Sequence, residues 1–153
     1  MQSKPHGMIP VTKAPKIKTA MTPFPHSVEI RAPISEAQDF MDEHDIRHLP
    51  VTENGVLIGV VTQRDISLLL GPTFDYPNPA DLTVTDAMVT ETFVVDLETP
   101  LAGVAKTMAD KHYGSALVTR RGKLAGIFTM TDACRVLADQ LSIDVDGEPD
   151  EAA

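Results

Sequence analysis

The sequence contains no tryptophan and only one cysteine, and aromatic residues make up 5% of it. A single cysteine excludes a disulfide within the chain and is typical of a reducing compartment. With so few aromatic residues, the core must be built from aliphatic side chains and methionine. No apolar run approaches the roughly 20 residues of a transmembrane helix, and proline and lysine interrupt the region where a signal peptide would lie. We therefore expect a cytoplasmic protein.

Charge of one sign is missing from each end of the chain. Residues 1–18 hold four lysines and no acidic residue, whereas residues 144–153 hold five acidic residues and no basic one. Both ends are therefore predicted to be solvated tails. The formal net charge of −9 over 153 residues disfavours binding to nucleic acid. A nucleic-acid role for Lys4–Lys18 with Arg120, Arg121 and Lys123 stays open as a weaker alternative.

The sequence repeats when it is shifted by 67 residues. Residues 18–66 align with residues 85–133 without a gap, and 12 of the 49 aligned pairs are identical. The glycine, threonine and aspartate of GVVTQRDI, residues 59–66, return in GIFTMTDA, residues 126–133. Repetition at this period predicts two copies of one structural unit. Because a unit of under about 70 residues buries little core alone, we expect the copies to pack on each other.

Each copy is predicted to fold as β-α-β-β-α, which makes the chain an α+β protein of two repeats with pseudo-twofold symmetry. A proline opens the first helix of each copy, and glycine supplies a positive φ in the ENG and RRG turns. The last helix of each copy is predicted at 63–70 and 130–141. The predicted organisation is a flexible leader at 1–17, a first repeat at 18–70, a linker at 71–84, a second repeat at 85–141 and an acidic disordered tail at 142–153.

This pattern resembles the CBS domain, and two copies in tandem resemble a Bateman module. The resemblance rests on Met21-Thr22, on IRHLPV at 46–51 and on the repeated G-h-h-T-x-x-D pattern (h, apolar), and it covers about residues 18–141. The second copy departs from it, with ALV in place of LPV and Val89 in place of Thr22. The resemblance implies a sensor of AMP, ADP, ATP or S-adenosylmethionine, sometimes of NAD or another nucleotide, and a disc-like homodimer.

The threonine and aspartate of each motif suit a nucleotide. Thr62 and Thr129 lie where a strand leads into a helix, and the free N–H groups and dipole there favour an anion. Asp65 and Asp132 follow, and a carboxylate can accept both vicinal hydroxyls of a ribose. A simpler role is also open, in which the threonine caps the helix and the aspartate lies in its first turn. We favour ligand binding because both copies keep the full set.

The resemblance implies two clefts, each combining the motif of one repeat with the second strand of the other. The first is expected to contain Val60, Thr62, Arg64, Asp65, Thr90, Gly114, Ser115 and Ala116. The second is expected to contain Ile127, Thr129, Thr131, Asp132, Thr22, Arg47, His48 and Leu49. Small Ala116 against bulky Leu49, and Arg64 against Thr131, predict unequal clefts. We expect the first cleft, with Asp65, to be the better ligand site.

Other charged and metal-binding side chains leave alternatives open. Arg64 can clamp a phosphate or stay solvated, and Arg47 with His48 can meet a polyphosphate. His44 and His48 have a helical metal-ligand spacing, but the helix is predicted to end before His48, so no metal site is predicted. Cys134 lies in a predicted helix and is expected to be buried.

The sequence contains no P-loop, nucleophile elbow or paired-carboxylate hydrolase site. We therefore expect no enzyme activity and no required cofactor. The expected function is a stand-alone regulatory module that binds an adenosine ligand between its repeats and signals through the packing of a homodimer. The regulated partner is then expected on another chain, with no membrane partner. The main alternative is a ligand-free scaffold that dimerises and docks a partner.

Overall fold

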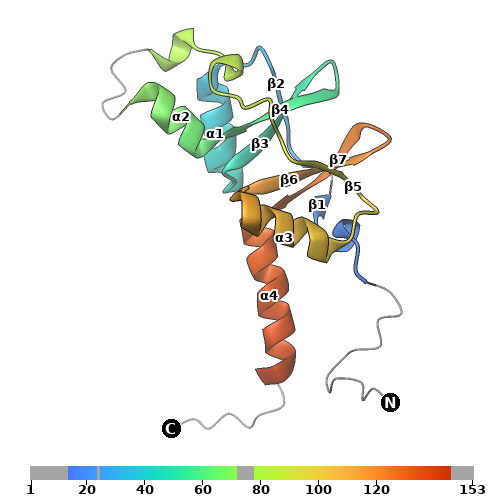
Figure 1. The fold of residues 1–153 in the computed structure, drawn as a ribbon. Helices are drawn as coiled ribbons and strands as arrows, with labels where there is room; N and C mark the ends of the chain where they lie inside the picture. The colour runs from blue at the N-terminus through green and yellow to red at the C-terminus, as the bar shows by residue number, and fades with distance from the viewer. Residues whose placement is uncertain (1–13, 24, 72–77, 146–153) are drawn as a thin grey trace, which may run out of the picture.

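The computed structural model describes residues 14–23, 25–71 and 78–145. It contains two β-sheets that lie one above the other, each with its own pair of helices (Figure 1). The order of elements along the chain confirms two β-α-β-β-α repeats and the predicted α+β class. Among the helices of the described residues, none is both long and apolar enough to span a bilayer.

The first repeat builds a sheet of order β2-β3-β4. Its elements are β2 (Val28–Glu29), α1 (Ile34–His44), β3 (His48–Glu53), β4 (Val56–Thr62) and α2 (Gln63–Leu70). β2 runs parallel to β3, and β3 runs antiparallel to β4. The hairpin turns at Asn54 and Gly55, which both have positive φ. Two consecutive residues in this conformation are typical of tight β-hairpins, as the sequence predicted.

The second repeat copies this arrangement. Its elements are β5 (Val94–Asp96), α3 (Leu101–Lys111), β6 (Ser115–Arg120), β7 (Lys123–Thr129) and α4 (Met130–Val145). β5 runs parallel to β6, and β6 runs antiparallel to β7. The register shift between Val118 and Thr119 corresponds to the one between Val51 and Thr52 in the first repeat. The repeat in the sequence is therefore a repeat in the structure.

Each sheet also pairs with a segment that precedes the other repeat in the chain. β1 (Thr22–Pro23) precedes β2, the first strand of the first sheet, but pairs antiparallel with β7 of the second sheet. At the equivalent place, Val89 exchanges two backbone hydrogen bonds with Val60 on β4, at 2.8 and 3.0 Å. Main-chain hydrogen bonds therefore tie the two repeats together.

The repeated glycines of the motif make room for these crossing segments. A Cβ on Gly59 would lie 2.6 Å from the carbonyl oxygen of Val89, and a Cβ on Gly126 would overlap the side chain of Met21. Neither glycine has a positive φ. Close approach of a second chain segment, rather than backbone freedom, therefore explains both glycines.

The apolar clusters also show that the segment before each repeat's first sheet strand packs into the other repeat. One core lies in each repeat, and a third cluster, made of Val60, Leu117 and Ile127, joins the two sheets. Val84 is fully buried in the core of the first repeat, and Ile17 is fully buried in the core of the second. The two repeats thus pack on each other, as their small size predicted.

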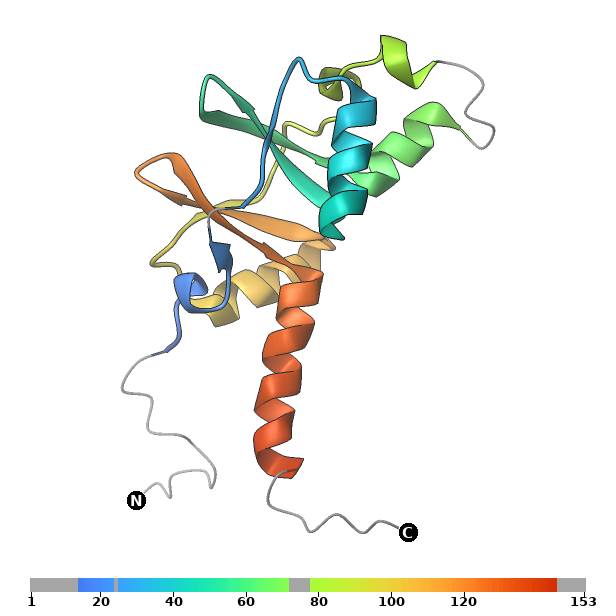
Figure 2. The same ribbon diagram turned by 180° about the vertical axis from the view of Figure 1, so that it is seen from behind.

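Three expectations need correction or completion at the ends of elements. Ile17 was expected in the flexible leader, but its side chain completes the second core; residues 1–13 of that leader lie outside the described residues. α4 continues to Val145, past the predicted end at 141, because the first helix-breaking residue is Gly147. Cys134 is exposed rather than buried, because Ala133 and Val136 are the side chains of this part of α4 that pack against the second core; the later turns of α4 project beyond the second sheet (Figure 2).

The predicted linker is only partly described. Residues 72–77 lie outside the described residues, and so do residues 146–153 of the predicted tail. Short 3-10 helices at Pro79–Asp81 and Val84–Asp86 lead the chain from the first repeat to the second. The backbone N–H of Val84 donates to the carbonyl of Ala32, which fixes this end of the linker to the first repeat.

Candidate functional site

The threonine and aspartate of each motif hold each other at the start of a helix. The Thr62 hydroxyl donates to Asp65 Oδ2 at 2.7 Å and accepts the Asp65 backbone N–H at 3.1 Å. Thr129 and Asp132 make the same contacts at 3.1 and 3.3 Å, and the Thr129 N–H donates to Asp132 Oδ2 at 2.9 Å. The helix-capping role that the sequence left open is therefore present in both copies. It uses Oδ2 in each case and leaves Oδ1 for other partners.

Asp132 is held from the opposite side as well. The hydroxyl of Thr22 on β1 donates to Asp132 Oδ1 at 3.2 Å, and Arg135 Nη1 lies 3.6 Å from the same oxygen. The Asp132 side chain is only 8% exposed, whereas Asp65 is half-buried. Because Thr22 comes from the exchanged segment, this contact exists only in the assembled pair of repeats. The carboxylate thus presents one oxygen whose partners a ligand hydroxyl can replace.

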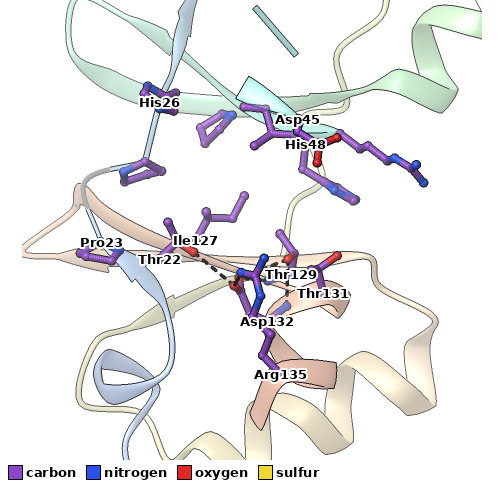
Figure 3. A pocket seen from close by; sticks show the side chains of 14 residues that line it. Thr22, Pro23, His26, Asp45, His48, Ile127, Thr129, Thr131, Asp132 and Arg135 are labelled. Carbon is purple, nitrogen blue, oxygen red and sulfur yellow. Dashed lines mark hydrogen bonds and ion pairs between the residues drawn. The ribbon is translucent and has the colours of Figure 1, made fainter. Parts of the chain in front are cut away.

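A cavity of about 480 Å³ opens beside Asp132 (Figure 3). Its lining comes from both repeats: from β1 and the loop after it, from the end of α1 and the start of β3, and from β7 with the start of α4. The lining residues are Thr22, Pro23, Pro25, His26, Asp45, Ile46, Arg47, His48, Pro50, Ile127, Thr129, Thr131, Asp132 and Arg135. Small-molecule sites typically have volumes of roughly 300–1,000 Å³. The cavity is therefore large enough for a nucleotide-sized ligand.

The second predicted cleft largely coincides with this cavity. Seven of its eight expected residues line it, namely Thr22, Arg47, His48, Ile127, Thr129, Thr131 and Asp132. The eighth, Leu49, is fully buried in the first core. Side chains alternate along a strand, so His48 and Pro50 face the cavity while Leu49 faces the core.

Sequence reasoning missed the other half of the lining. These residues are Pro23, Pro25, His26, Asp45, Ile46, Pro50 and Arg135. Arg135 follows Asp132 by three residues, and that spacing on a helix could have identified it. His26 and Asp45 lie in loops, and only the path of the folded chain brings them to the cavity.

Cationic groups gather along the cavity. Arg47 and Arg135 carry fixed positive charges, and His26 and His48 add two imidazoles. The first turn of α4 borders the same space, and the helix dipole there favours an anion, although the Met130 and Asp132 N–H groups already donate to Gly114 and Thr129. Two guanidinium groups beside the start of a helix favour an anion such as phosphate.

His48 is the side chain whose protonation the site alters. Burial lowers the pKa of its imidazole below the ordinary value of 6.5; the Asp65 carboxylate raises it in part, and Arg47 lowers it again. His48 is therefore mainly neutral at pH 7, and the arginines supply the permanent positive charge of the cavity.

The first predicted cleft is built differently. His48 lies opposite Thr62 in the β3–β4 pairing. Its ring packs against Gly114, because a Cβ built there would be 2.8 Å from His48 Nε2. The cavity beside Asp132 does not include Asp65. The cleft that the sequence favoured is therefore not the one in which this cavity opens.

The predicted reason for unequal clefts was wrong in one respect. Leu49 and Ala116 are both fully buried in the cores of their own repeats, so the difference in their size does not shape the clefts. Of the other residues expected in the first cleft, Arg64 and Thr90 are exposed, Ser115 is half-buried opposite Thr129, and Val60 lies in the cluster between the sheets.

The basic residues considered for nucleic-acid binding lie in two separate places. Lys16 and Lys18 both form ion pairs with Glu98, which neutralises part of the N-terminal positive charge. Arg120, Arg121 and Lys123 lie exposed at the β6–β7 hairpin. The nucleic-acid alternative stays a prediction with less charge available to it.

The two histidines with metal-ligand spacing point to different neighbours. His44 at the end of α1 stacks on His26, with ring centroids 4.2 Å apart, and also contacts Phe40. His48 instead packs on Gly114. Within the part of the chain that the structure describes, no three metal-ligating side chains come together.

Comparisons with known proteins match these repeats. The family model described as CBS domain matches twice, at residues 17–71 and 84–139. Three curated proteins are similar: "Uncharacterized protein YlbB" of Bacillus subtilis (47% identity over 53 residues), "Zinc metalloprotease MJ0392" of Methanocaldococcus jannaschii (31% over 123) and "CBS domain-containing protein YhcV" of Bacillus subtilis (28% over 116). The matches cover 35%, 80% and 76% of this chain, and 36%, 32% and 81% of those proteins. The chain thus spans about a third of the length of the first two relatives.

Solved structures share the fold. A putative acetoin utilization protein (AcuB) from Vibrio cholerae has a TM-score of 0.77 and 25% identity, with 90% of this chain and 100% of that chain covered. The CBS domain pair of MJ0100, in complex with 5′-methylthioadenosine and S-adenosyl-L-methionine, has a TM-score of 0.74 and 22% identity, with 84% and 99% covered. CBSX2 in complex with AMP has a TM-score of 0.70 and 25% identity, with 82% and 98% covered.

Proposed function

Since this chain belongs to the CBS-domain family and carries two copies of the domain, we propose that it is a regulatory module that binds an adenosine-containing ligand beside Asp132. The observation that carries the proposal is the cavity there, which both repeats line and which combines a buried carboxylate with two arginines. MJ0100 and CBSX2, which share the fold, bind ligands that have adenosine in common. That shared part supports adenosine as the recognised group.

Asp132 is the proposed ribose acceptor. Its Oδ2 is already occupied by Thr129, whereas its Oδ1 contacts the Thr22 hydroxyl and Arg135. A ribose hydroxyl can donate to Oδ1 once Arg135 turns toward another anion. The Thr22 hydroxyl stays within reach as a second polar partner. The buried position of Asp132 makes such a hydrogen bond stronger than it would be in water.

The two arginines of the cavity favour a phosphate group on the ligand, while Asp45 and Asp132 balance their formal charge. Arg47, Arg135 and the first turn of α4 all attract anions, and His48 adds a donor when it is protonated. AMP, ADP and ATP carry phosphate, whereas S-adenosylmethionine carries a sulfonium cation that two guanidinium groups repel. We therefore place the adenine nucleotides before S-adenosylmethionine, which remains the alternative ligand.

Ligand binding is proposed to signal through the packing of the two repeats. The cavity is lined by both, so a bound nucleotide stabilises the arrangement in which they surround it. The size of the response equals the difference in affinity between the two arrangements. We propose that a homodimer transmits this change to a partner on another chain, and that the module itself catalyses no reaction.

Thermal unfolding with AMP, ADP, ATP and S-adenosylmethionine tests the proposal. A ligand at one hundred times its dissociation constant should stabilise the wild-type chain by about 2.7 kcal/mol. Asp132→Asn should remove this shift, because a neutral amide is a weaker acceptor for the ribose hydroxyl and places an NH₂ donor at one of the two oxygen positions. Asp65→Asn is the matched control and should leave the shift in place. A panel without any shift, or a shift that survives Asp132→Asn, would contradict the assignment.

A ligand-free scaffold is the second candidate, and α4 favours it. Met130, Leu137 and Leu141 on this helix are 51%, 58% and 54% exposed. Leu137 and Leu141 are four residues apart and so lie on one face, which a second copy of the chain could cover. Leu137→Glu with Leu141→Glu should then convert a dimer to a monomer in light scattering coupled to size exclusion. Leu68→Glu, at an exposed leucine of α2, is the control.

A further inference from the structure

We propose that His48 closes the cleft beside Asp65 and so directs the ligand to the cleft beside Asp132. This inference rests on the proposed function and adds to it the residue that decides between two related clefts. It concerns a side chain outside the repeated motif, at a position where the two repeats differ.

The His48 side chain borders both the cavity beside Asp132 and the segment expected to line the cleft beside Asp65. It lines the cavity beside Asp132 and is the first residue of β3. Its ring also lies against Gly114: a Cβ built there would be 2.8 Å from Nε2, 3.6 Å from Cε1 and 3.8 Å from Cδ2. The imidazole therefore fills the space in front of the start of β6. That is where Gly114, Ser115 and Ala116 were expected to line the first cleft.

Gly114 fits this ring for a steric reason. Its φ is not positive, so its backbone conformation does not require glycine. A side chain at position 114 would force the imidazole to move, because a Cβ at 2.8 Å is closer than van der Waals contact allows. Glycine at 114 and histidine at 48 thus form a matched pair across the two repeats.

The Asp65 carboxylate also lies near this ring. His48 is opposite Thr62, the cap residue of the helix that carries Asp65. The Asp65 carboxylate also raises the pKa of His48, which requires the two groups to be near each other. The imidazole is therefore close both to the expected ribose acceptor of the first cleft and to Gly114, which precedes the strand expected to cover the base.

The equivalent residue in the other repeat is much smaller. Ser115 corresponds to His48 in the 67-residue repeat. It lies opposite Thr129, as His48 lies opposite Thr62. A hydroxymethyl group leaves space where an imidazole fills it, and the described cavity lies on the Asp132 side. This substitution between the repeats thus removes space from the Asp65 cleft that the Asp132 cleft keeps.

Calorimetric titration of the full chain with AMP tests this inference. The wild type should bind one AMP per chain, and Asp132→Asn should abolish that binding. His48→Ser, which gives both repeats the same residue, should raise the stoichiometry to two. Adding Asp65→Asn to His48→Ser should return it to one. His112→Asn removes an exposed imidazole outside the cavity lining and should leave the stoichiometry at one.

A second measurement tests the contact without any ligand. Gly114→Ala should lower the melting temperature of the wild type, since the new methyl group meets the imidazole, but should have little effect in the His48→Ser background. Equal effects in both backgrounds would show that the ring does not occupy this space, and would overturn the inference.

The outcomes separate the inference from the proposed function. Two AMP molecules per wild-type chain, or no added site in His48→Ser, would overturn the inference and leave a nucleotide sensor in place. If the wild type binds no AMP, the proposed function fails for this nucleotide. The inference would then be upheld only if His48→Ser creates a site that Asp65→Asn removes, and refuted otherwise.

Discussion

His48 and Ser115 occupy equivalent positions of the two repeats, and single side chains such as these make the copies differ. The motif pairs, Thr62 with Asp65 and Thr129 with Asp132, perform the same capping in both. Their surroundings do not match, because Asp132 also contacts Thr22 and Arg135. The chemistry of each cleft is therefore set by residues next to the motif.

The imidazole of His48 should titrate below pH 6.5. Burial and Arg47 lower its pKa by more than Asp65 raises it. Because the folded value lies below the unfolded one, the linked stability is present above pH 6.5 and is lost as the pH falls through the folded pKa. An NMR titration of the ring checks this, and Asp65→Asn should lower the value further. A pKa at or above 6.5 would show that the ring is not buried.

The stabilising contribution of Glu98 should be lost at a lower pH than that of His48. Hydrogen bonds from Lys16 and Lys18 lower its pKa from 4.5 to about 2. The contribution is therefore present above pH 4.5 and is lost as the pH falls toward 2. All three side chains are exposed, so salt screens the contribution and keeps it small.

Thermal unfolding of Glu98→Gln tests the contribution of the ion pairs between Glu98 and the two lysines. The variant should lose less stability than the wild type as the pH falls through this range at low salt, because it has no carboxylate to protonate. High salt should bring the two proteins together. An unchanged pH dependence would mean that the ion pairs contribute nothing measurable.

At the scale of elements, strands β4 and β7 each carry a crossing segment. Val89 bonds to Val60 on β4, and Thr22 pairs with Ile127 on β7. In both cases a glycine of the motif lets the backbone of the crossing segment approach. The repeated glycine therefore belongs to the joining of the repeats, while the repeated threonine and aspartate belong to the start of the following helix.

Alanine substitutions should distinguish a glycine that is required by close packing from one that only lowers helix propensity. Gly59→Ala should destabilise the fold by about 1–3 kcal/mol, because its Cβ would meet the carbonyl oxygen of Val89 at 2.6 Å. Gly103 in α3 is the control, since its Cβ would meet nothing within 4 Å. Gly103→Ala should stabilise by roughly 0.5–1 kcal/mol. Denaturant unfolding measures both, and a neutral Gly59→Ala would contradict the close approach.

At the scale of the whole molecule, the exchanged segments make the two repeats one cooperative unit. Ile17 fills the second core although it precedes the first repeat, and Val84 fills the first core although it precedes the second. Lys16 bridges to Pro100, and Thr83 bridges to Pro33 in the equivalent way. A ligand that holds the repeats together therefore acts on a connected structure.

Hydrogen exchange of the backbone amides should show that the stability of each repeat depends on a side chain that precedes the other repeat's sheet. Ile17→Ala removes a fully buried side chain and should cost about 2–5 kcal/mol. Exchange should then accelerate first in α3 and β7 of the second repeat. Val84→Ala is the matched variant and should loosen α1 and β3 of the first repeat. If Ile17→Ala instead loosened the first repeat, or Val84→Ala the second, the crossed packing of these side chains would be contradicted.

Much of this protein was determined by the sequence alone, because local spacing carries the information. The β-α-β-β-α order, the hairpin turns and seven residues of the cavity follow from periodicity, turn chemistry and the resemblance. Only the tertiary structure decided that a cavity lies beside Asp132, that Ile17 is core, and that Thr22 meets Asp132. These depend on contacts such as that of His48 with Gly114, between residues 66 positions apart (114 minus 48). Packing between repeats sets such contacts, and the periodicity within one repeat carries no information about them.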